Sequence, residues 1–358
     1  MIRERASFLA NYLFCKLLKR PRIFWATIYL TYACNFRCKH CYGKYGERYD
    51  NRESDDFTMH FDRVEYIVKK LAKYGCRYIA LLGGEPLLHK DISKIINIIR
   101  TYGIEVAIVT NGSLIEANVD KLKKVSTLTI SIDGDEEAND FLRGRGRYRR
   151  SLELIKKLKQ YRINLHISTT LYKKSIDKIE DLLIFAGKHN VLVGFCPLMY
   201  QSYLDNDLAY LHPSDEQYRS FYNKVIKLKK GKKYPIMYSK ESYKSMLKWP
   251  DFNKPLILRD ESVSLKDMNF PECLAGKKYI YITPGGDIYP CSQLIGTEKF
   301  LAKNIFEDGF EEAWRHAWPI PCKACTNIGF LDLNMMLSFR LKSILSMVKQ
   351  TFWEFLNR

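Results

Sequence analysis

Between Phe24 and about Cys196, short apolar runs alternate with segments whose apolar residues recur at helical spacing, which restricts the possible folds strongly. The predicted strands cover residues 25–32, 78–82, 105–109, 127–132, 164–170 and 191–195. The predicted helices cover residues 61–73, 92–102, 114–124, 148–160 and 176–189. Such repeats imply parallel strands joined by right-handed crossovers. We therefore expect an α/β fold, either a partial (β/α)6 barrel or a doubly wound sheet, with its chemistry at the C-terminal strand ends.

Three cysteines follow directly on the first predicted strand: Cys34, Cys38 and Cys41. Their thiolates can ligate three irons of a [4Fe–4S] cluster, whereas full ligation by protein takes four cysteines. The fourth iron would then be open to a substrate or cofactor, as the open position is in catalytic metal sites. A zinc knuckle is the alternative, but zinc usually needs a fourth ligand, and His40 is too close to Cys41 to serve easily.

The ten cysteines of this 358-residue chain point to a reducing compartment. A secreted protein would use them in disulfides, but residues 1–22 are interrupted by charges and contain no clean apolar signal segment. The cysteines are also clustered at spacings typical of metal ligands. We therefore expect a cytoplasmic protein whose clustered cysteines are thiolate ligands.

The Cys-x3-Cys-x2-Cys spacing resembles the radical S-adenosylmethionine (radical SAM) superfamily. The resemblance implies that the open iron chelates the amino and carboxylate groups of S-adenosylmethionine. One electron from the reduced cluster would then yield a 5′-deoxyadenosyl radical, which abstracts hydrogen from an unactivated C–H bond. It also implies a TIM-like partial barrel, an electron donor such as flavodoxin or ferredoxin, and cofactor contacts from His40 and Tyr42 beside the cysteines.

Further motifs at the predicted strand ends support this resemblance. Gly83, Gly84, Glu85 and Pro86 end the second strand and look like the family's GGEP motif, which receives the methionine amino group. Asn111 ends the third strand, and Ser131 and Asp133 end the fourth. The resemblance implies that these three residues bind the cofactor. By resemblance, Ser131 and Arg143 contact the methionine carboxylate, and an arginine fork suits a carboxylate. A solvated surface position is the alternative for Arg143, because four more arginines lie nearby at 145–150.

A second cysteine group surrounds a predicted hairpin turn at residues 283–287. It comprises Cys273, Cys291, Cys322 and Cys325. Four cysteines can close a zinc site or fully ligate another [4Fe–4S] cluster, and spacing alone does not choose between them. The group looks like the SPASM/Twitch extension of radical SAM enzymes. No cysteine follows Cys325, so the shorter Twitch form, with one auxiliary cluster, is the better match.

Three cysteines and one histidine lie outside these motifs. Cys15, Cys76 and Cys196 are expected to be small buried hydrophobic residues. Cys196 ends the sixth predicted strand, so a catalytic role as hydrogen donor is the alternative for it. His166 lies on a strand and is expected to be a hydrogen-bonded core histidine.

The formal net charge of +18 favours an anionic partner, although a lysine-rich solvated surface is an equal alternative. Both ends of the chain read as basic amphipathic helices, which lie in a membrane interface or pack on the protein's own core. No apolar run is long enough to span a membrane. We expect an anionic membrane surface as partner, with the protein peripheral on the inner face, and no nucleic acid.

These observations predict five segments and an enzymatic function. The segments are a basic amphipathic N-terminal stretch at 1–25, the barrel at 26–200, a connection at 201–270, the auxiliary cluster domain at 271–330 and a basic amphipathic helix at 331–358. The expected substrate is a membrane lipid or isoprenoid. The alternatives are a ribosomally made peptide, against which the short stretch before the barrel counts mildly, and a non-enzymatic metal-binding scaffold.

Overall fold

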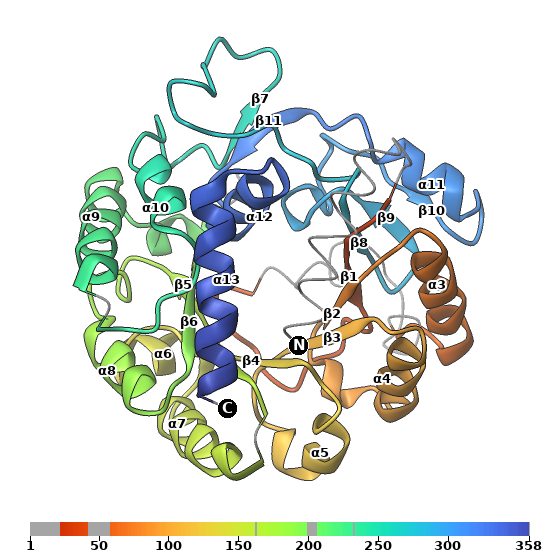
Figure 1. Ribbon diagram of the computed structural model, residues 1–358, viewed down its shortest axis with the longest axis horizontal. Coiled ribbons are helices and arrows are strands. Elements are labelled where there is room, and N and C mark those ends of the chain that lie inside the picture. Colours follow the sequence, from red (N-terminus) through yellow and green to blue (C-terminus); the bar gives the residue numbers. More distant parts are fainter. Residues whose placement is uncertain (1–21, 42–57, 162, 199–205, 232, 358) are drawn as a thin grey trace. The chain divides into compact units, whose positions relative to one another are not determined.

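The computed structural model describes residues 22–41, 58–161, 163–198, 206–231 and 233–357 (Figure 1). The chain divides into two compact units, and each is described here by itself. The first unit comprises Met1–Asn35, Gly43–Leu128 and Leu274–Ile320. The second unit comprises Phe36–Tyr42, Thr129–Cys273 and Pro321–Arg358. This division differs from the segments predicted from sequence, because most of the predicted auxiliary domain belongs to the same unit as the first strands.

The first unit is built on parallel strands at the start of the barrel. Its elements up to residue 128 are β1 (Trp25–Tyr29), α3 (Phe61–Lys73), β2 (Tyr78–Leu82), the 3-10 turn η3 (Pro86–Leu88), α4 (Ile92–Thr101), β3 (Glu105–Thr110), α5 (Ile115–Leu122) and the beginning of β4 (Thr127–Ser131). Strand β2 pairs in parallel with β1 and β3. The bounds of α3 and β2 are those predicted, because α3 has a buried stripe at helical spacing and β2 is a short apolar run.

The predicted hairpin is present and extends the same sheet. It is formed by β8 (Tyr279–Ile282) and β9 (Asp287–Tyr289), and β10 (Lys303–Asn304) pairs with β9. The 3-10 turn η6 (Ser292–Leu294) and helix α11 (Phe310–His316) complete this part. Strand β8 runs parallel to β1, from Trp25 opposite Tyr279 to Ile28 opposite Ile282. This pairing joins residues 274–320 to the first strands, which the cysteine spacing could not indicate.

The second unit contains the later strands of the barrel and the C-terminal helices. Its elements are the end of β4, α6 (Glu136–Arg143), α7 (Arg147–Leu158), η4 (Lys159–Tyr161), β5 (Leu165–Leu171), α8 (Glu180–Lys188), β6 (Leu192–Pro197), η5 (Asn206–Leu211), α9 (Asp215–Gly231), α10 (Lys240–Met246), β7 (Leu256–Leu258), β11 (Cys322–Cys325), α12 (Ile328–Leu337) and α13 (Leu341–Leu356). Strands β5 and β6 are parallel, whereas β11 and β7 form a small antiparallel pair.

Two features of this unit differ from the sequence-based expectation. Helix α6 was not predicted; the Asp135 side chain caps it by accepting a hydrogen bond of 2.8 Å from the Ala138 amide. The predicted C-terminal helix is divided into α12 and α13, because Phe339 adopts a left-handed conformation with φ of 60°. Helix α13 packs against α10 and α12 (Figure 1).

Candidate active site

The two glycines after β2 allow that strand end to pack directly against the segment leading into Cys34. The Gly84 amide donates to the Thr31 carbonyl at 2.6 Å, and the Glu85 amide donates to the Ala33 carbonyl at 2.9 Å. A Cβ on Gly84 would lie 2.2 Å from the Ala33 carbonyl oxygen, and Gly83 also has a φ of +143°. Only glycine tolerates so close an approach at these positions. The motif therefore fixes the backbone that presents Cys34.

Glu85 is fully buried, and both of its carboxylate oxygens accept hydrogen bonds within the first unit. Oε1 accepts from the Thr110 hydroxyl at 2.8 Å and from the Leu87 amide at 3.1 Å, and Oε2 accepts from the Asn111 amide at 2.8 Å. Burial raises the pKa of Glu85, although these donors oppose the shift. The carboxylate thus ties the ends of β2 and β3 together, and its expected contact with a methionine amino group stays a prediction.

Asn111 connects the end of β3 to the first cysteine. Its Nδ2 donates to Asn35 Oδ1 at 2.9 Å and lies 3.9 Å from Cys34 Sγ. Asn35 in turn donates to the Ser113 hydroxyl at 2.8 Å, and that hydroxyl donates to Asn111 Oδ1 at 2.6 Å. Asn35 and Ser113 were not predicted as site residues. Their only sequence signal is adjacency to Cys34 and to the Thr110-Asn111-Gly112 strand end.

Cys38 and Cys41 belong to the second unit, where α6 holds the turn that carries them. The Cys41 amide donates to the Cys38 carbonyl at 3.2 Å, and the Lys39 amide donates to the Leu142 carbonyl at 2.9 Å. Both cysteines affect the pKa of the Arg143 side chain. Burial would lower the pKa of Arg143, but Asp133, Cys38 and Cys41 outweigh this effect and raise it. The guanidinium is therefore a permanent positive charge beside two sulfurs.

The buried Asp133 carboxylate lies close to three polar groups of the second unit. Its Oδ2 accepts from Arg143 Nε at 2.6 Å, and its Oδ1 accepts from the Thr170 amide at 2.7 Å. Burial would raise the pKa of Asp133, but Arg143 and His40 lower it overall. His40 Nε2 lies 3.6 Å from Oδ2. Burial lowers the pKa of His40 to about 4 despite Asp133, so this imidazole is neutral near pH 7.

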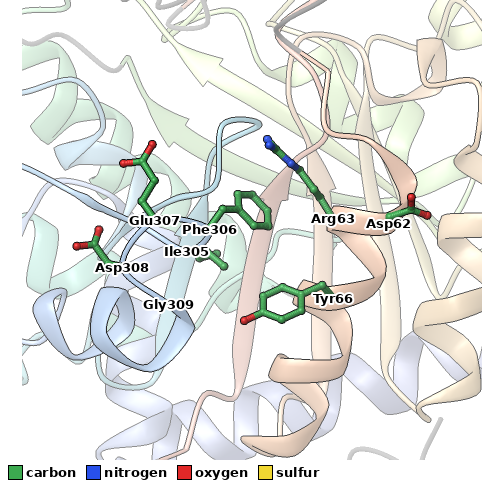
Figure 2. A pocket seen from close by; sticks show the side chains of 8 residues that line it. All are labelled: Asp62, Arg63, Tyr66, Ile305, Phe306, Glu307, Asp308 and Gly309. Atoms are coloured by element: carbon green, nitrogen blue, oxygen red, sulfur yellow. The ribbon is translucent and has the colours of Figure 1, made fainter.

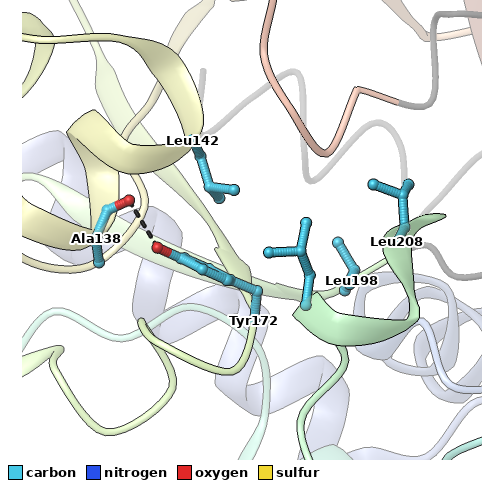
Figure 3. Packing of buried hydrophobic residues seen from close by; sticks show 6 residues of the cluster. Ala138, Leu142, Tyr172, Leu198 and Leu208 are labelled. Carbon is cyan, nitrogen blue, oxygen red and sulfur yellow. Dashed lines mark hydrogen bonds between the residues drawn. The ribbon is translucent and has the colours of Figure 1, made fainter.

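An apolar cluster anchors α6, which carries Arg143. Tyr172 lies at its centre, and the Tyr172 hydroxyl donates to the Ala138 carbonyl at 2.8 Å (Figure 3). The other buried members are Ala138, Leu142, Leu198, Leu208 and Leu211. Because α6 is fixed on one side by its packing and at its start by Asp135, the Arg143 guanidinium is held toward Asp133 and does not extend into solvent. The solvated-surface alternative for Arg143 is therefore wrong.

The other residues singled out from the sequence are Ser131, Tyr42, His166 and the three cysteines outside the two groups. Ser131 ends β4 and is half-buried, whereas Tyr42 and Cys15 lie outside the described residues. Burial raises the pKa of the Cys76 thiol to about 12 and also raises that of Cys196, so neither is a ready thiolate. The Cys196 sulfur lies 4.0 Å from the Ser168 hydroxyl. His166 is buried, and its Nε2 lies 3.0 Å from Glu354 Oε1, as expected of a hydrogen-bonded core histidine.

The second cysteine group is distributed over both units. Cys322 and Cys325 are the ends of β11, and Cys273 accepts a 3.7 Å contact from Asn334 Nδ2. Burial raises the pKa of the Cys325 thiol, and Cys273 and Cys322 raise it further. A cationic centre bound at Cys325 would oppose this effect and stabilise its thiolate. Cys291 is buried at the start of η6 in the first unit.

The donor sets of both cysteine groups consist of sulfur, which suits iron–sulfur clusters. Among the described residues, no three His, Cys, Asp or Glu side chains meet closely enough to hold a single metal ion. The ligand assignments of both cysteine groups stay predictions.

The first unit also contains an open pocket of about 540 Å³ (Figure 2). Arg63 and Tyr66 of α3 face the segment from Ile305 to Gly309 across it, and Asp62 of the same helix also lines the pocket. The Arg63 guanidinium lies 4.5 Å from the centre of the Phe306 ring. No cysteine or strand-end motif residue lines this pocket, so it is not the predicted cofactor site.

Comparison with known proteins agrees with the radical SAM resemblance of the cysteine motif. Residues 28–186 match the Radical SAM superfamily. The chain is 27% identical over 323 residues to "Mycofactocin maturase MftC" of Mycolicibacterium smegmatis, which covers 85% of this chain and 74% of that protein. It is 25% identical over 297 residues to "AdoMet-dependent heme synthase" of Methanosarcina barkeri, which covers 80% and 81%.

A solved structure shares the fold. Streptococcus suis SuiB bound to S-adenosylmethionine superposes with a TM-score of 0.63 at 20% identity, covering 86% of this chain and 69% of SuiB. The same protein has been solved bound to its precursor peptide SuiA, with a TM-score of 0.62. In the part of the chain that the structure describes, no helix is long and apolar enough to cross a membrane.

Proposed function

Because this chain belongs to the radical SAM superfamily, we propose that it is a maturase that removes a hydrogen atom from a ribosomally made peptide. The chain is an enzyme with a partial, open α/β barrel, and its cofactors are S-adenosylmethionine and [4Fe–4S] clusters. The peptide is the proposed part. It is supported by the similarity to MftC, named a maturase, and to SuiB, which has been solved with a precursor peptide.

The lipid or isoprenoid substrate expected from the amphipathic ends has no support among these relatives. The peptide alternative is better supported and replaces it as the main hypothesis. The heme synthase is similar over most of its length, so a tetrapyrrole substrate is the specific rival to a peptide. A non-enzymatic scaffold is no longer a competing interpretation, because the chain shares its family and fold with enzymes.

In this proposal Cys34, Cys38 and Cys41 hold the cluster that binds S-adenosylmethionine. When bound and reduced, this cluster would supply the electron for one-electron cleavage of S-adenosylmethionine. Gly83, Gly84 and Pro86 shape the backbone that faces the cofactor, and Asn111 places a donor 3.9 Å from Cys34 Sγ. Cys273, Cys291, Cys322 and Cys325 hold the auxiliary cluster. A flavodoxin or ferredoxin supplies the electron.

Asp133 and Arg143 act together in this proposal. Asp133 fixes the guanidinium through Nε, so the planar fork of Arg143 has one orientation when it meets the methionine carboxylate. Neutral His40 adds no second positive charge beside Cys38 and Cys41 near pH 7. Ser131, at the end of β4, adds a hydroxyl as a second contact for the methionine carboxylate. The buried Asp133–Arg143 pair is the observation that carries this proposed cofactor site.

Cleavage of S-adenosylmethionine tests the first part of the proposal. The anaerobically reconstituted protein should form 5′-deoxyadenosine with dithionite, and Cys38→Ala should abolish it. Cys76→Ala is the matched control, because Cys76 is buried in the first unit and outside both cysteine groups. Equal product from wild type and Cys38→Ala would refute the assignment.

The substrate requires a separate measurement. A peptide encoded beside the gene for this chain should be made with deuterated residues and incubated with the loaded enzyme. We expect deuterium in the 5′-deoxyadenosine, together with a changed peptide mass. Deuterium transfer from a deuterated iron tetrapyrrole, with none from the peptide, would replace the peptide by the tetrapyrrole rival.

A further inference from the structure

Helix α13 presents a continuous apolar stripe to solvent. Its members recur every three or four residues, so they lie on one side of the helix. They are Leu341, Leu345, Val348, Phe352 and Leu356, with exposed fractions of 74%, 56%, 49%, 54% and 63%. Single exposed apolar side chains are ordinary on protein surfaces, whereas a contiguous row of five on one side of a helix points to an interaction surface. The sequence analysis left open that this stripe packs on the protein's own core. That interpretation is wrong for these five residues, because they are exposed.

The opposite side of α13 is polar and buried, which fixes the orientation of the helix. Ser343, Thr351 and Glu354 are at most 7% exposed. Glu354 Oε1 lies 3.0 Å from His166 Nε2 of β5, and the Ser343 hydroxyl lies 3.3 Å from the Ser239 hydroxyl. If the helix were rotated to turn the apolar stripe inward, both contacts would break, and His166 and Ser239 would lose these hydrogen-bond partners. The outward stripe is therefore part of the packed arrangement of the second unit.

Basic residues border the stripe. Arg340, Lys342 and Lys349 are exposed. The one acidic residue between Leu341 and Leu356 is Glu354, which is buried at 2% exposure. The face that α13 presents is therefore apolar in the middle and positive at its side, on a chain of net charge +18. A negatively charged partner with an apolar interior complements this pattern.

The size and shape of the stripe argue against a protein as its partner. A 16-residue helix is about 24 Å long, and a stripe about 10 Å wide then covers about 240 Å². A stable protein interface needs about 800 Å² on each partner. Pairing with a second copy would also bring like charges together. A peptide usually binds in a groove or at a sheet edge, whereas the ridge of a single helix is convex.

We propose that α13 docks this protein on an anionic lipid surface, with the helix lying in the plane of the interface. The apolar stripe would enter the boundary between headgroups and acyl chains, and Arg340, Lys342 and Lys349 would contact the headgroups. This placement needs no spanning helix, and none is found among the described residues. The proposal concerns where the enzyme sits and is independent of the peptide substrate.

Vesicle co-sedimentation tests the proposal with the full-length reconstituted protein. The probes are vesicles of phosphatidylcholine alone and of phosphatidylcholine with phosphatidylglycerol. We expect sedimentation with the anionic vesicles only, and an about tenfold smaller bound fraction for Leu345→Glu/Phe352→Glu. Both side chains are exposed, so the variant should keep its fold, which 5′-deoxyadenosine formation at the wild-type rate would confirm.

The control must carry the same added charge at another place. Ile184→Glu/Leu301→Glu replaces two other exposed apolar side chains, 55% and 79% exposed, and should bind vesicles like wild type. Equal loss in both double variants would show a general charge effect and overturn the role of α13. Unchanged binding of Leu345→Glu/Phe352→Glu would overturn it as well. A wild-type dimer in light scattering that this variant dissociates would assign the stripe to a second copy.

Discussion

Arg143 Nε donates to Asp133 Oδ2 at 2.6 Å, and the Asp133 side chain has no exposed surface. The two residues are ten positions apart, on the strand end after β4 and at the last position of α6. Sequence comparison predicted each as a separate cofactor contact. The structure shows that they form one unit, so the orientation of the arginine depends on the aspartate.

Breaking this pair should be costly, because it leaves a buried charge without its partner. We expect Arg143→Gln to lower the free energy of unfolding by about 3 kcal/mol. Asp133→Asn/Arg143→Gln should recover much of that loss, because it removes both charges. Urea denaturation of wild type, both single variants and the double variant measures the coupling. Additive losses would show that the two side chains do not stabilise each other.

Gly84 should tolerate no side chain, since a Cβ would lie 2.2 Å from the Ala33 carbonyl oxygen. Gly84→Ala must move the segment before Cys34, and we expect the reconstituted protein to fall from about eight irons per chain to about four. Gly231→Ala is the control, because nothing lies within 4 Å of a Cβ placed there. Full iron content in Gly84→Ala would contradict the positioning role of this glycine.

Asn111 should tune the first cluster through its amide, 3.9 Å from Cys34 Sγ. Hydrogen bonds to the sulfurs are one determinant of cluster potential, and a donor favours the more negative reduced state. We expect Asn111→Ala to lower the reduction potential of this cluster in a titration followed by electron paramagnetic resonance. Asn118→Ala, which removes an amide bonded to the Leu114 carbonyl, should leave the potential unchanged.

The second cysteine group should be separable from cofactor cleavage. Cys322→Ala/Cys325→Ala removes both sulfurs of β11, and we expect about four irons per chain instead of about eight. Formation of 5′-deoxyadenosine should persist, because Cys34, Cys38 and Cys41 are unchanged. Retention of all the iron would instead show that Cys322 and Cys325 are not cluster ligands.

Lys229 should make the stability of the protein depend on pH above neutrality. Burial lowers the pKa of Lys229 to about 8, against an ordinary value of 10.5, and its Nζ lies 2.5 Å from the Ile236 carbonyl. Between these pKa values the unfolded chain binds more protons than the folded one, so this group's contribution to stability rises with pH. Below pH 8 both states are protonated, and the penalty for the buried charge is complete.

The difference between two variants isolates this effect. Lys229→Met should lose the part of the stability increase that wild type shows between about pH 8 and pH 10, on the order of 1 kcal/mol. Lys227→Met, at an exposed position of the same helix, should keep it. Thermal unfolding at several pH values measures both. Parallel curves for wild type and Lys229→Met would contradict the lowered pKa.

Most of the barrel elements were predictable because local periodicity determined them. Helix α3 and strand β2 have the predicted bounds, since their apolar residues are placed by a 3.6-residue repeat and by a short continuous run. Helix α6 was missed because it has only eight residues and few of them are apolar, and its start depends on one capping aspartate. The break at Phe339 depends on a single backbone conformation that the sequence does not signal.

The sequence by itself determined the chemistry of this protein, because thiols at Cys34, Cys38 and Cys41 and glycines at 83 and 84 are properties of residue type and spacing. Tertiary structure decided which groups these residues meet. The Glu85 carboxylate accepts hydrogen bonds from the Thr110 hydroxyl and from the Asn111 and Leu87 amides. The Arg143 guanidinium is bound by Asp133. It also decided which side of α13 is buried. Contacts between residues far apart in the chain depend on how elements pack, and local patterns carry no record of that packing.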